Sequence, residues 1–276
     1  MKTSSKIIIY DDGCPLCAAY TSAFVVTGLL NDQGRKNFSN IDAATFECID
    51  KAICNNEIPL IDTETKQVWY GVDALLELLD SKIPFIKTIG NIFPVKYCLQ
   101  KMYKFISYNR KVVVATSEKN GYDCSPDFNV RYRVFFLAFF LFFNTWMLEP
   151  LFETVFSNSF IRNSSFNQIQ WAHLLLVGCN IAIAASLGIK KGLEYAGQVN
   201  MLALTCILLI VPLHLVNQNT NILATSINNF YLCMVSLFII KEYIRRMKYA
   251  LVIPLHPGIV CINIISVLLF IFYLVY

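Results

Sequence analysis

Residues Gln198–Val216 read QVNMLALTCILLIVPLHLV and contain no Asp, Glu, Lys or Arg. A helix of about 20 such residues is long enough to span the roughly 30 Å hydrocarbon core of a lipid bilayer. Four more apolar runs of similar length occur in the second half of the chain: Val134–Phe152, Trp171–Ile189, Ile222–Ile240 and Leu255–Tyr276. The sequence therefore predicts an integral membrane protein with an all-α transmembrane bundle of about five helices.

Charged residues divide the chain into two halves of different character. They make up 15% of the 276 residues, against about a quarter in an ordinary globular domain. They occur throughout Met1–Arg133 and afterwards only in small clusters between apolar runs. We expect a soluble domain over 1–83, amphipathic helices and a linker over 84–130, and a transmembrane domain over 131–276. The formal net charge of +4 is small and scattered, so no nucleic-acid partner is expected.

The loops between the apolar runs differ in positive charge. Lys and Arg mark the cytoplasmic side of membrane proteins. They precede the first run, separate the second from the third, and follow the fourth: Arg131, Arg133, Lys190, Lys191, Lys241, Arg245, Arg246 and Lys248. The remaining loops hold Arg162 and the uncharged segment Asn217–Asn221. This pattern predicts a cytoplasmic N-terminus, an external C-terminus and residence in the inner or cytoplasmic membrane. The first apolar stretch, Ile7–Tyr10, is too short for a signal peptide.

The first 83 residues alternate between strand and helix patterns in the order β-α-β-α-β-β-α. Turn residues separate short β-branched runs from segments with helical apolar spacing. The expected strands are Lys6–Tyr10, Phe38–Ile41, Glu57–Asp62 and Gln67–Tyr70, and the expected helices are Cys14–Leu30, Ala43–Ile53 and Val72–Leu79. This order resembles the minimal thioredoxin-like arrangement, so the fold class is α/β thioredoxin-like. Pro84–Val114 predicts amphipathic helices at the membrane surface or against the domain, and Glu118–Asn129 predicts the linker.

Cys14 and Cys17 form a Cys-x-x-Cys pair directly after the first strand. Pro15 suits the first turn of a helix, which places Cys14 at the positive end of the helix dipole. That position favours the thiolate of Cys14, the species that attacks a disulfide. Cys17 lies one turn further on, where it can resolve the mixed disulfide. A nearby carboxylate raises the pKa of a thiol, so we expect Asp11 to exchange a proton with Cys17.

Pro59 stands near the start of the third expected strand. In thioredoxin-like domains, the strand that faces the Cys pair usually begins with a cis-proline. If the chain has that fold, we expect a cis Ile58–Pro59 bond beside the Cys14–Cys17 turn. The Ile58 backbone would then be free to bind an extended substrate. A proline inside a central strand would otherwise remove a ladder hydrogen bond.

Three motifs together resemble the DCC family of predicted thiol-disulfide oxidoreductases. They are Asp11-x-x-Cys14-x-x-Cys17, Trp69-Tyr70-Gly71-Val72-Asp73-Ala74-Leu75 and Ser107-Tyr108-Asn109-Arg110. The resemblance covers about Lys6–Val112 and implies a thioredoxin-like fold with redox-active cysteines. Many members have Gly directly after the Asp, where this sequence has Asp12. The membrane region lies outside the resemblance.

Two other interpretations of the Cys pair remain open, namely an inactive scaffold and half of a structural zinc site. Zinc requires two further ligands at similar spacing. Cys48 and Cys54 are separated by five residues, and no His precedes His173. We therefore expect no metal and no cofactor.

Polar and sulfur residues inside the apolar runs also allow two interpretations. Cys179, Cys206 and Cys233 could pass reducing equivalents, although small apolar residues are common in packed helices. His173 and His214 could bind haem or a quinone, or bond to neighbouring helices. Asn side chains are costly in lipid unless they face other helices or a partner, which predicts a packed bundle or a subunit interface for Asn144, Asn180, Asn228, Asn229 and Asn263.

Two functions follow from these observations. The first is a membrane-anchored thiol-disulfide oxidoreductase that uses Cys14 and Cys17 on the cytoplasmic face. Its substrate would be a thiol-containing protein or a small molecule. The alternative is a non-catalytic accessory subunit of a membrane protein complex, in which the thioredoxin-like domain is a docking module.

Overall fold

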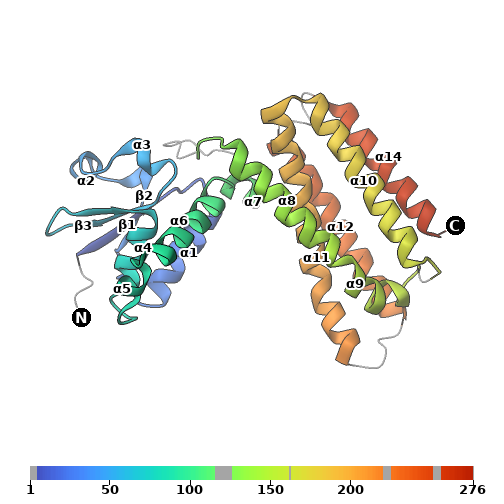
Figure 1. Cartoon of the computed structure of the whole chain (residues 1–276), viewed down its shortest axis with the longest axis horizontal. Helices are drawn as coiled ribbons and strands as arrows, with labels where there is room; N and C mark the ends of the chain where they lie inside the picture. Colours follow the sequence, from blue (N-terminus) through green and yellow to red (C-terminus); the bar gives the residue numbers. More distant parts are fainter. Residues whose placement is uncertain (1–4, 116–125, 162, 220–224, 251–255, 276) are drawn as a thin grey trace. The chain divides into compact units, whose positions relative to one another are not determined.

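The computed structural model describes residues 5–115, 126–161, 163–219, 225–250 and 256–275. The chain divides into two compact units, Met1–Tyr132 and Arg133–Tyr276. The first unit contains a small mixed sheet with helices on it, and the second consists of long helices (Figure 1). We call them the N-terminal unit and the membrane unit.

The N-terminal unit is built on a four-stranded sheet with the order β2-β1-β3-β4. Its strands are β1 (Lys6–Tyr10), β2 (Arg35–Asn37), β3 (Pro59–Asp62) and β4 (Val68–Tyr70). Strand β1 pairs in parallel with β2 and antiparallel with β3, and β3 pairs antiparallel with β4. The third strand therefore lies beside the first.

Alternate residues of the two central strands enter two apolar cores. Ile8 and Leu60 point to one face, where they pack with Ala74 and Leu78 of α4 (Gly71–Leu79). Tyr20 and Phe24 of α1 (Pro15–Val26) pack against the same cluster.

The other face of the sheet is covered by short helices. Ile9 and Ile61 pack there with Phe38, Ile49 and Cys54. The covering elements are η1 (Phe38–Asn40), α2 (Ala43–Glu47) and α3 (Lys51–Cys54). The sheet is thus buried on both faces, because side chains alternate along a strand.

Several predicted boundaries differ from the structure. The second strand lies at Arg35–Asn37, and Phe38–Asn40 forms a 3-10 turn instead. The helix expected over Ala43–Ile53 is two helices, because the Asp50 side chain accepts a hydrogen bond from the Ala52 N–H and caps a new start. Helix α1 ends at Val26, and Gly28 follows with a φ of +67°, a conformation that favours glycine.

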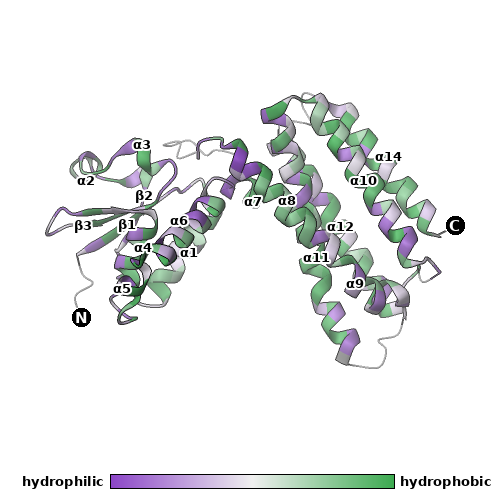
Figure 2. Ribbon diagram, viewed as in Figure 1, coloured by the Kyte–Doolittle hydropathy of each residue, from purple (hydrophilic) through white to green (hydrophobic). Residues whose placement is uncertain are grey.

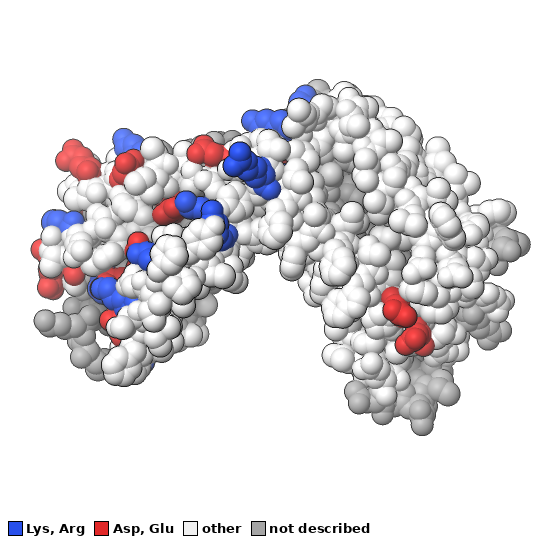
Figure 3. Space-filling model, in the orientation of Figure 1, with Lys and Arg blue, Asp and Glu red and all other residues white. Residues whose placement is uncertain are grey.

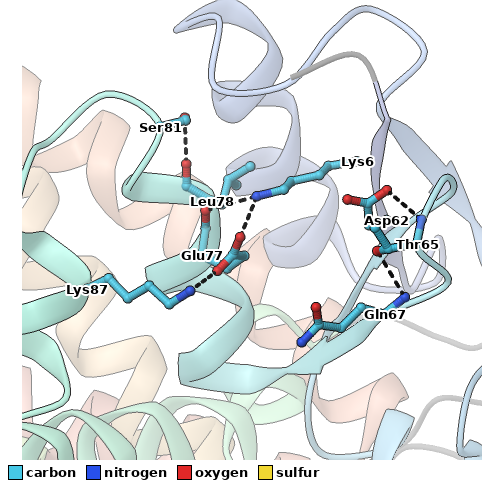
Figure 4. A network of polar contacts seen from close by, with 8 residues as sticks. All are labelled: Lys6, Asp62, Thr65, Gln67, Glu77, Leu78, Ser81 and Lys87. Carbon is cyan, nitrogen blue, oxygen red and sulfur yellow. Dashed lines mark hydrogen bonds and ion pairs between the residues drawn. The ribbon is translucent and has the colours of Figure 1, made fainter. Parts of the chain in front are cut away.

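A carboxylate on α4 joins two other elements of the N-terminal unit. Glu77 accepts a hydrogen bond from Lys6 of β1 at 2.6 Å and from Lys87 of α5 (Ile86–Gly90) at 2.5 Å (Figure 4). Burial raises the pKa of Glu77, but the two ammonium groups outweigh it and hold that pKa below its usual value. The two ion pairs hold α4 to the start of β1 and to α5.

Two further helices complete the N-terminal unit. Helix α6 (Phe93–Ser107) packs against α4 and α5. Helix α7 (Arg110–Val114) follows and contacts α1. The Asn109 side chain lies buried between them and donates hydrogen bonds to the carbonyls of Phe105 and Tyr132.

The membrane unit contains long apolar helices, which are predominantly hydrophobic in Figure 2. Within the described part of the chain, five segments are long and apolar enough to cross a bilayer: Val130–Asn158, Phe166–Ser186, Ile189–Gln218, Thr225–Tyr249 and Pro257–Leu274. Each overlaps one predicted run, which indicates an integral membrane protein. The elements are α8 (Val130–Trp146), α9 (Leu148–Thr154), η2 (Phe156–Asn158), α10 (Phe166–Ser186), α11 (Ile189–Asn219), α12 (Thr225–Tyr249) and α14 (Pro257–Val275).

Asparagines inside these helices bond to neighbouring segments. Asn144 of α8 donates to the Asn200 side chain of α11 at 2.7 Å. Asn263 of α14 and Asn180 of α10 both bond to the Tyr195 hydroxyl of α11. Asn228 donates to two backbone carbonyls, those of Val155 and Asn158, and Asn229 accepts from the Phe160 N–H. These contacts confirm the prediction that the five asparagines face packed protein.

Helices α10 and α11 are joined by a turn of Leu187 and Gly188. Gly188 has a φ of +77°. A Cβ atom at Gly192 would lie 2.1 Å from the Ala184 carbonyl oxygen, far inside van der Waals contact. The two helices therefore approach each other closely at this turn.

Several sequence predictions concern residues partly or wholly outside the described ranges. They include the linker Glu118–Asn129, the outer-loop Arg162, the loop Asn217–Asn221 and the ends of the runs Ile222–Ile240 and Leu255–Tyr276. On the face drawn in Figure 3, charged side chains gather on the N-terminal unit, and the membrane unit is largely uncharged. The cytoplasmic N-terminus and external C-terminus remain predictions from the sequence.

Candidate functional site

Cys14 and Cys17 lie at the junction between β1 and α1. Cys14 is the N-cap residue of α1, and its Sγ accepts a hydrogen bond from the Cys17 N–H at 3.4 Å. Pro15 occupies the first turn, where a missing N–H costs nothing. Cys14 and Cys17 are free thiols, 5% and 4% exposed. The sequence placed both residues in this first turn, and the structure has them there.

The pKa values of the two thiols are shifted in opposite directions. A hydrogen bond from the Cys17 side chain lowers the pKa of Cys14 to about 7. The Cys17 N–H and the charge of Arg110 contribute to this lowered pKa, and burial opposes it. The same hydrogen bond, together with burial, raises the pKa of Cys17. Cys14 is thus partly thiolate near neutral pH while Cys17 keeps its proton, which is the division that thiol-disulfide exchange requires.

A buried guanidinium group lies next to this pair. Arg110, the first residue of α7, donates to the Asp11 Oδ2 at 3.4 Å and to the Asn55 carbonyl at 3.2 Å. Asp11 and Arg110 are both buried. The Asp11 Oδ1 also accepts a hydrogen bond from the Gly13 N–H at 2.9 Å. The chain therefore brings residues 11 and 110, at opposite ends of the N-terminal unit's sequence, into one ion pair.

Burial sets the acidity of the Asp11 carboxyl. It raises the pKa of Asp11, and Arg110 and the Gly13 N–H oppose that shift. Asp11 in turn contributes to the raised pKa of Cys17 by like-charge repulsion. Sequence reasoning identified Asp11 but did not assign a role to Arg110. The Ser107–Arg110 motif was the signal that could have found it.

A cavity of about 280 Å³ opens beside Cys17. Its wall combines apolar side chains of α1, α4 and α6 with the Arg110 guanidinium and two tyrosines, Tyr20 and Tyr103. Burial raises the pKa of both tyrosines, so both remain neutral hydrogen-bonding groups at physiological pH. The cavity is large enough for a small molecule or one side chain of a larger substrate.

A larger cavity of about 580 Å³ lies elsewhere in the N-terminal unit. Its wall includes Glu57, Trp69, Tyr70, Asp73 and Lys87. It contains no thiol among the described residues that line it, so we place the candidate chemistry in the smaller cavity beside Cys17.

The prediction of a cis bond before Pro59 is wrong, since the Ile58–Pro59 bond is trans. The prediction that the Ile58 backbone is free is also wrong. The Ile58 N–H donates to the Tyr103 hydroxyl at 2.9 Å, and its carbonyl accepts from the Gly71 N–H at 3.0 Å. Pro59 itself pairs with Tyr70 in the β3–β4 ladder. The argument for substrate binding by Ile58 and Pro59 is thereby removed, because internal partners occupy the Ile58 groups that would bind substrate.

The other cysteines and histidines have individual surroundings. Cys54 is buried in the core on the far face of the sheet, where burial raises its pKa to about 12. His173 bonds to the Thr145 hydroxyl at 3.1 Å, and His214 to the Thr154 hydroxyl at 2.7 Å. Across the described residues, no three His, Cys, Asp or Glu side chains gather as ligands for a metal ion.

Comparisons with known proteins add no relative. No family model matches the chain, and no curated protein or solved structure is similar to it. The resemblance to the DCC family therefore stays a prediction, and any function must be argued from the site itself.

Proposed function

We propose that the protein is a membrane-anchored thiol-disulfide oxidoreductase in which Cys14 attacks and Cys17 resolves. The carrying observation is the Cys14 thiol at the helix N-cap, where it accepts the Cys17 N–H and has a pKa of about 7. The strand order β2-β1-β3-β4 supports a thioredoxin-like assignment, since that arrangement has the third strand beside the first.

The proposed reaction transfers two electrons. The Cys14 thiolate attacks one sulfur of a substrate disulfide, forms a mixed disulfide and expels the other substrate sulfur as a thiolate. Cys17 then loses its proton and attacks the Cys14 sulfur. The products are a Cys14–Cys17 disulfide and two substrate thiols, and the reverse sequence oxidises a substrate dithiol.

Asp11 and Arg110 have distinct roles in this proposal. Arg110 stabilises the Cys14 thiolate by its positive charge and keeps Asp11 paired. Asp11, whose pKa is raised by burial, accepts the proton of Cys17 when the mixed disulfide resolves. In this proposal, the cavity beside Cys17 holds part of the substrate next to the Cys pair.

A trapping experiment tests the proposal on the full-length reduced protein in nanodiscs, with glutathione disulfide as the probe. The wild type should lose two hydrogen atoms in mass and form the Cys14–Cys17 disulfide. Cys17→Ser should stop at a Cys14–glutathione mixed disulfide, and Cys14→Ser should form neither. Cys98, an exposed thiol on α6, provides the matched control, since Cys98→Ser should behave as wild type.

The accessory-subunit alternative expects a different result. A wild type that forms no Cys14–Cys17 disulfide, with Cys14→Ser and Cys17→Ser both neutral for function in cells, would favour a docking module. Two observations favour this alternative, namely the trans Ile58–Pro59 bond and the hydrogen-bonded Ile58 backbone.

We also propose that the N-terminal unit is cytoplasmic, as the loop charges predict. Asn163, before α10, and Lys191, in the first turn of α11, are both exposed and are expected on opposite sides of the membrane. In intact cells with a Cys98→Ser background, a membrane-impermeant maleimide should label Asn163→Cys and not Lys191→Cys. Labelling of Lys191→Cys alone would reverse the orientation.

A further inference from the structure

Helix α6 presents two different faces. Its inner face is fixed to the domain, where the Ser107 hydroxyl bonds to the Asn56 carbonyl and Tyr103 accepts the Ile58 N–H. Lys96 forms an ion pair with Asp73 of α4 at 2.8 Å. These contacts orient the helix about its own axis, so the side chains that point away from the domain are determined.

The outer face of α6 is apolar and exposed. Phe93 is 82% exposed and Tyr97 56%. At 3.6 residues per turn, Phe93 and Tyr97 lie on the same side of the helix as Lys101 and Lys104. The rings of Phe93 and Tyr97 stack with their centroids 6.5 Å apart. Two large exposed rings in contact mark this side of the helix as an interaction surface.

Positive charge accompanies this surface. Helix α6 contains Lys96, Lys101 and Lys104 and no acidic residue. The Lys101 ammonium lies 5.1 Å above the centre of the Tyr97 ring. Lysines are depleted in protein–protein interfaces, whereas aromatic rings beside basic residues suit the headgroup region of an anionic membrane. The combination favours a lipid surface over a protein partner.

We propose that the outer face of α6, defined by Phe93, Tyr97, Lys101 and Lys104, binds the anionic headgroup region of the membrane in which the chain is anchored. The apolar side chains enter the boundary between headgroups and acyl chains, and Lys101 and Lys104 contact lipid phosphates. The five membrane-length helices of the same chain supply the bilayer at a high effective concentration. The proposal is independent of the chemistry at Cys14.

Photo-crosslinking tests this surface with the full-length protein in vesicles that carry a diazirine-labelled phospholipid. In vesicles with about 30% phosphatidylglycerol, peptide mapping should find lipid adducts on Phe93–Ser107 as well as on the membrane helices. The double variant Lys101→Glu with Lys104→Glu should lower the α6 adducts at least about tenfold, and adducts on α14 should stay unchanged. The same loss should occur for wild type in purely zwitterionic vesicles.

A charge-matched control separates this site from general electrostatics. Lys51 and Lys66 lie outside α5 and α6, so Lys51→Glu with Lys66→Glu should leave the α6 adducts at the wild-type level. Absence of lipid adducts on α6 while α14 is labelled would overturn the proposal. It would also be overturned if the yield of α6 adducts were the same in charged and zwitterionic vesicles and after the Lys101 and Lys104 substitutions. A second copy seated on this face would produce the first of these results.

Discussion

The two units bury polar groups in different ways. In the N-terminal unit, Cys17, Arg110 and two tyrosines line one cavity, and Asp11 and Cys14 are bonded to Arg110 and Cys17. In the membrane unit, buried polar side chains are spread along the helices and join one helix to the next, as Asn144 joins Asn200 and Arg246 joins Gln198. Arg133 likewise pairs with Glu194 at 3.1 Å.

The difference indicates where chemistry can take place. A polar group that is buried in lipid or in a protein core needs a hydrogen-bond partner. Pairs between neighbouring helices meet that requirement without forming a binding or catalytic site. Stability alone does not require several polar groups to gather at one cavity. Groups that do so shift one another's pKa values. The comparison assigns the candidate chemistry to the N-terminal unit and the anchoring to the membrane unit.

The largest expected effect is at the Asp11–Arg110 pair. Arg110→Gln leaves the buried Asp11 carboxylate without its partner, which should cost about 3–5 kcal/mol of unfolding free energy. Denaturant unfolding of the purified full chain measures this cost. The double variant Asp11→Asn with Arg110→Gln should recover part of the loss, because no uncompensated charge then remains.

Arg35 is the matched control for this experiment. It is partly buried in the same unit and donates to the Ala18 carbonyl at 3.1 Å. Arg35→Gln should therefore cost about 1 kcal/mol, the worth of an ordinary hydrogen bond. Equal losses for Arg35→Gln and Arg110→Gln would show that the Asp11–Arg110 pair contributes no more than an ordinary hydrogen bond in the same unit.

The Arg110 contact also shows what local sequence patterns can and cannot predict. The five membrane helices and the β-α-β-α-β-β-α order were predictable because hydrophobic run length and periodicity are local properties. The Asp11–Arg110 pair joins residues 99 positions apart. The Ser107–Arg110 motif singles out Arg110, but no local pattern shows that it contacts Asp11. The cis Pro59 prediction was wrong because it was derived from the expected fold. Trans is the common state of an X–Pro bond, and Tyr103, on a distant helix, already binds the Ile58 N–H.

The next effect is the difference in reactivity between the two thiols. At pH 7, about half of Cys14 should be thiolate, since its pKa is about 7. Cys17, with a raised pKa, should be almost wholly protonated, so limiting alkylation should favour Cys14 by roughly 100-fold. Peptide mapping after iodoacetamide treatment measures the ratio. Preferential labelling of Cys17 would contradict the N-cap assignment of Cys14.

The same thiol should make the protein pH-dependent. The pKa of Cys14 is lowered from 9.0 to about 7, so between these values the unfolded state binds the extra proton. The Cys14 contribution to stability therefore increases as pH rises through this window and is lost as pH falls through about 7. Its alkylation rate should rise about tenfold from pH 6 to pH 8. A Cys14 rate that rises only above pH 9 would exclude the lowered pKa.

The smallest expected effect is in the membrane unit. Asn144→Leu removes the hydrogen bond to Asn200 and should cost roughly 0.6 kcal/mol, up to about 1.7, as interhelical hydrogen bonds in lipid do. Unfolding by a denaturing detergent in bicelles measures it, with the exposed Asn167→Ala as the control. If Asn144→Leu lowered the unfolding free energy as much as Arg110→Gln, the polar pairs of the membrane unit would contribute as much to stability as the Asp11–Arg110 pair.

The turn between α10 and α11 has a consequence for how the chain is made. Leu187 and Gly188 are the entire connection, and the closeness of Gly192 to the Ala184 carbonyl allows no side chain there. Such a short connection leaves no hydrophilic loop on which a ribosome-bound chain could pause between two insertion events. We therefore expect α10 and α11 to enter the bilayer together as one helical hairpin during biosynthesis.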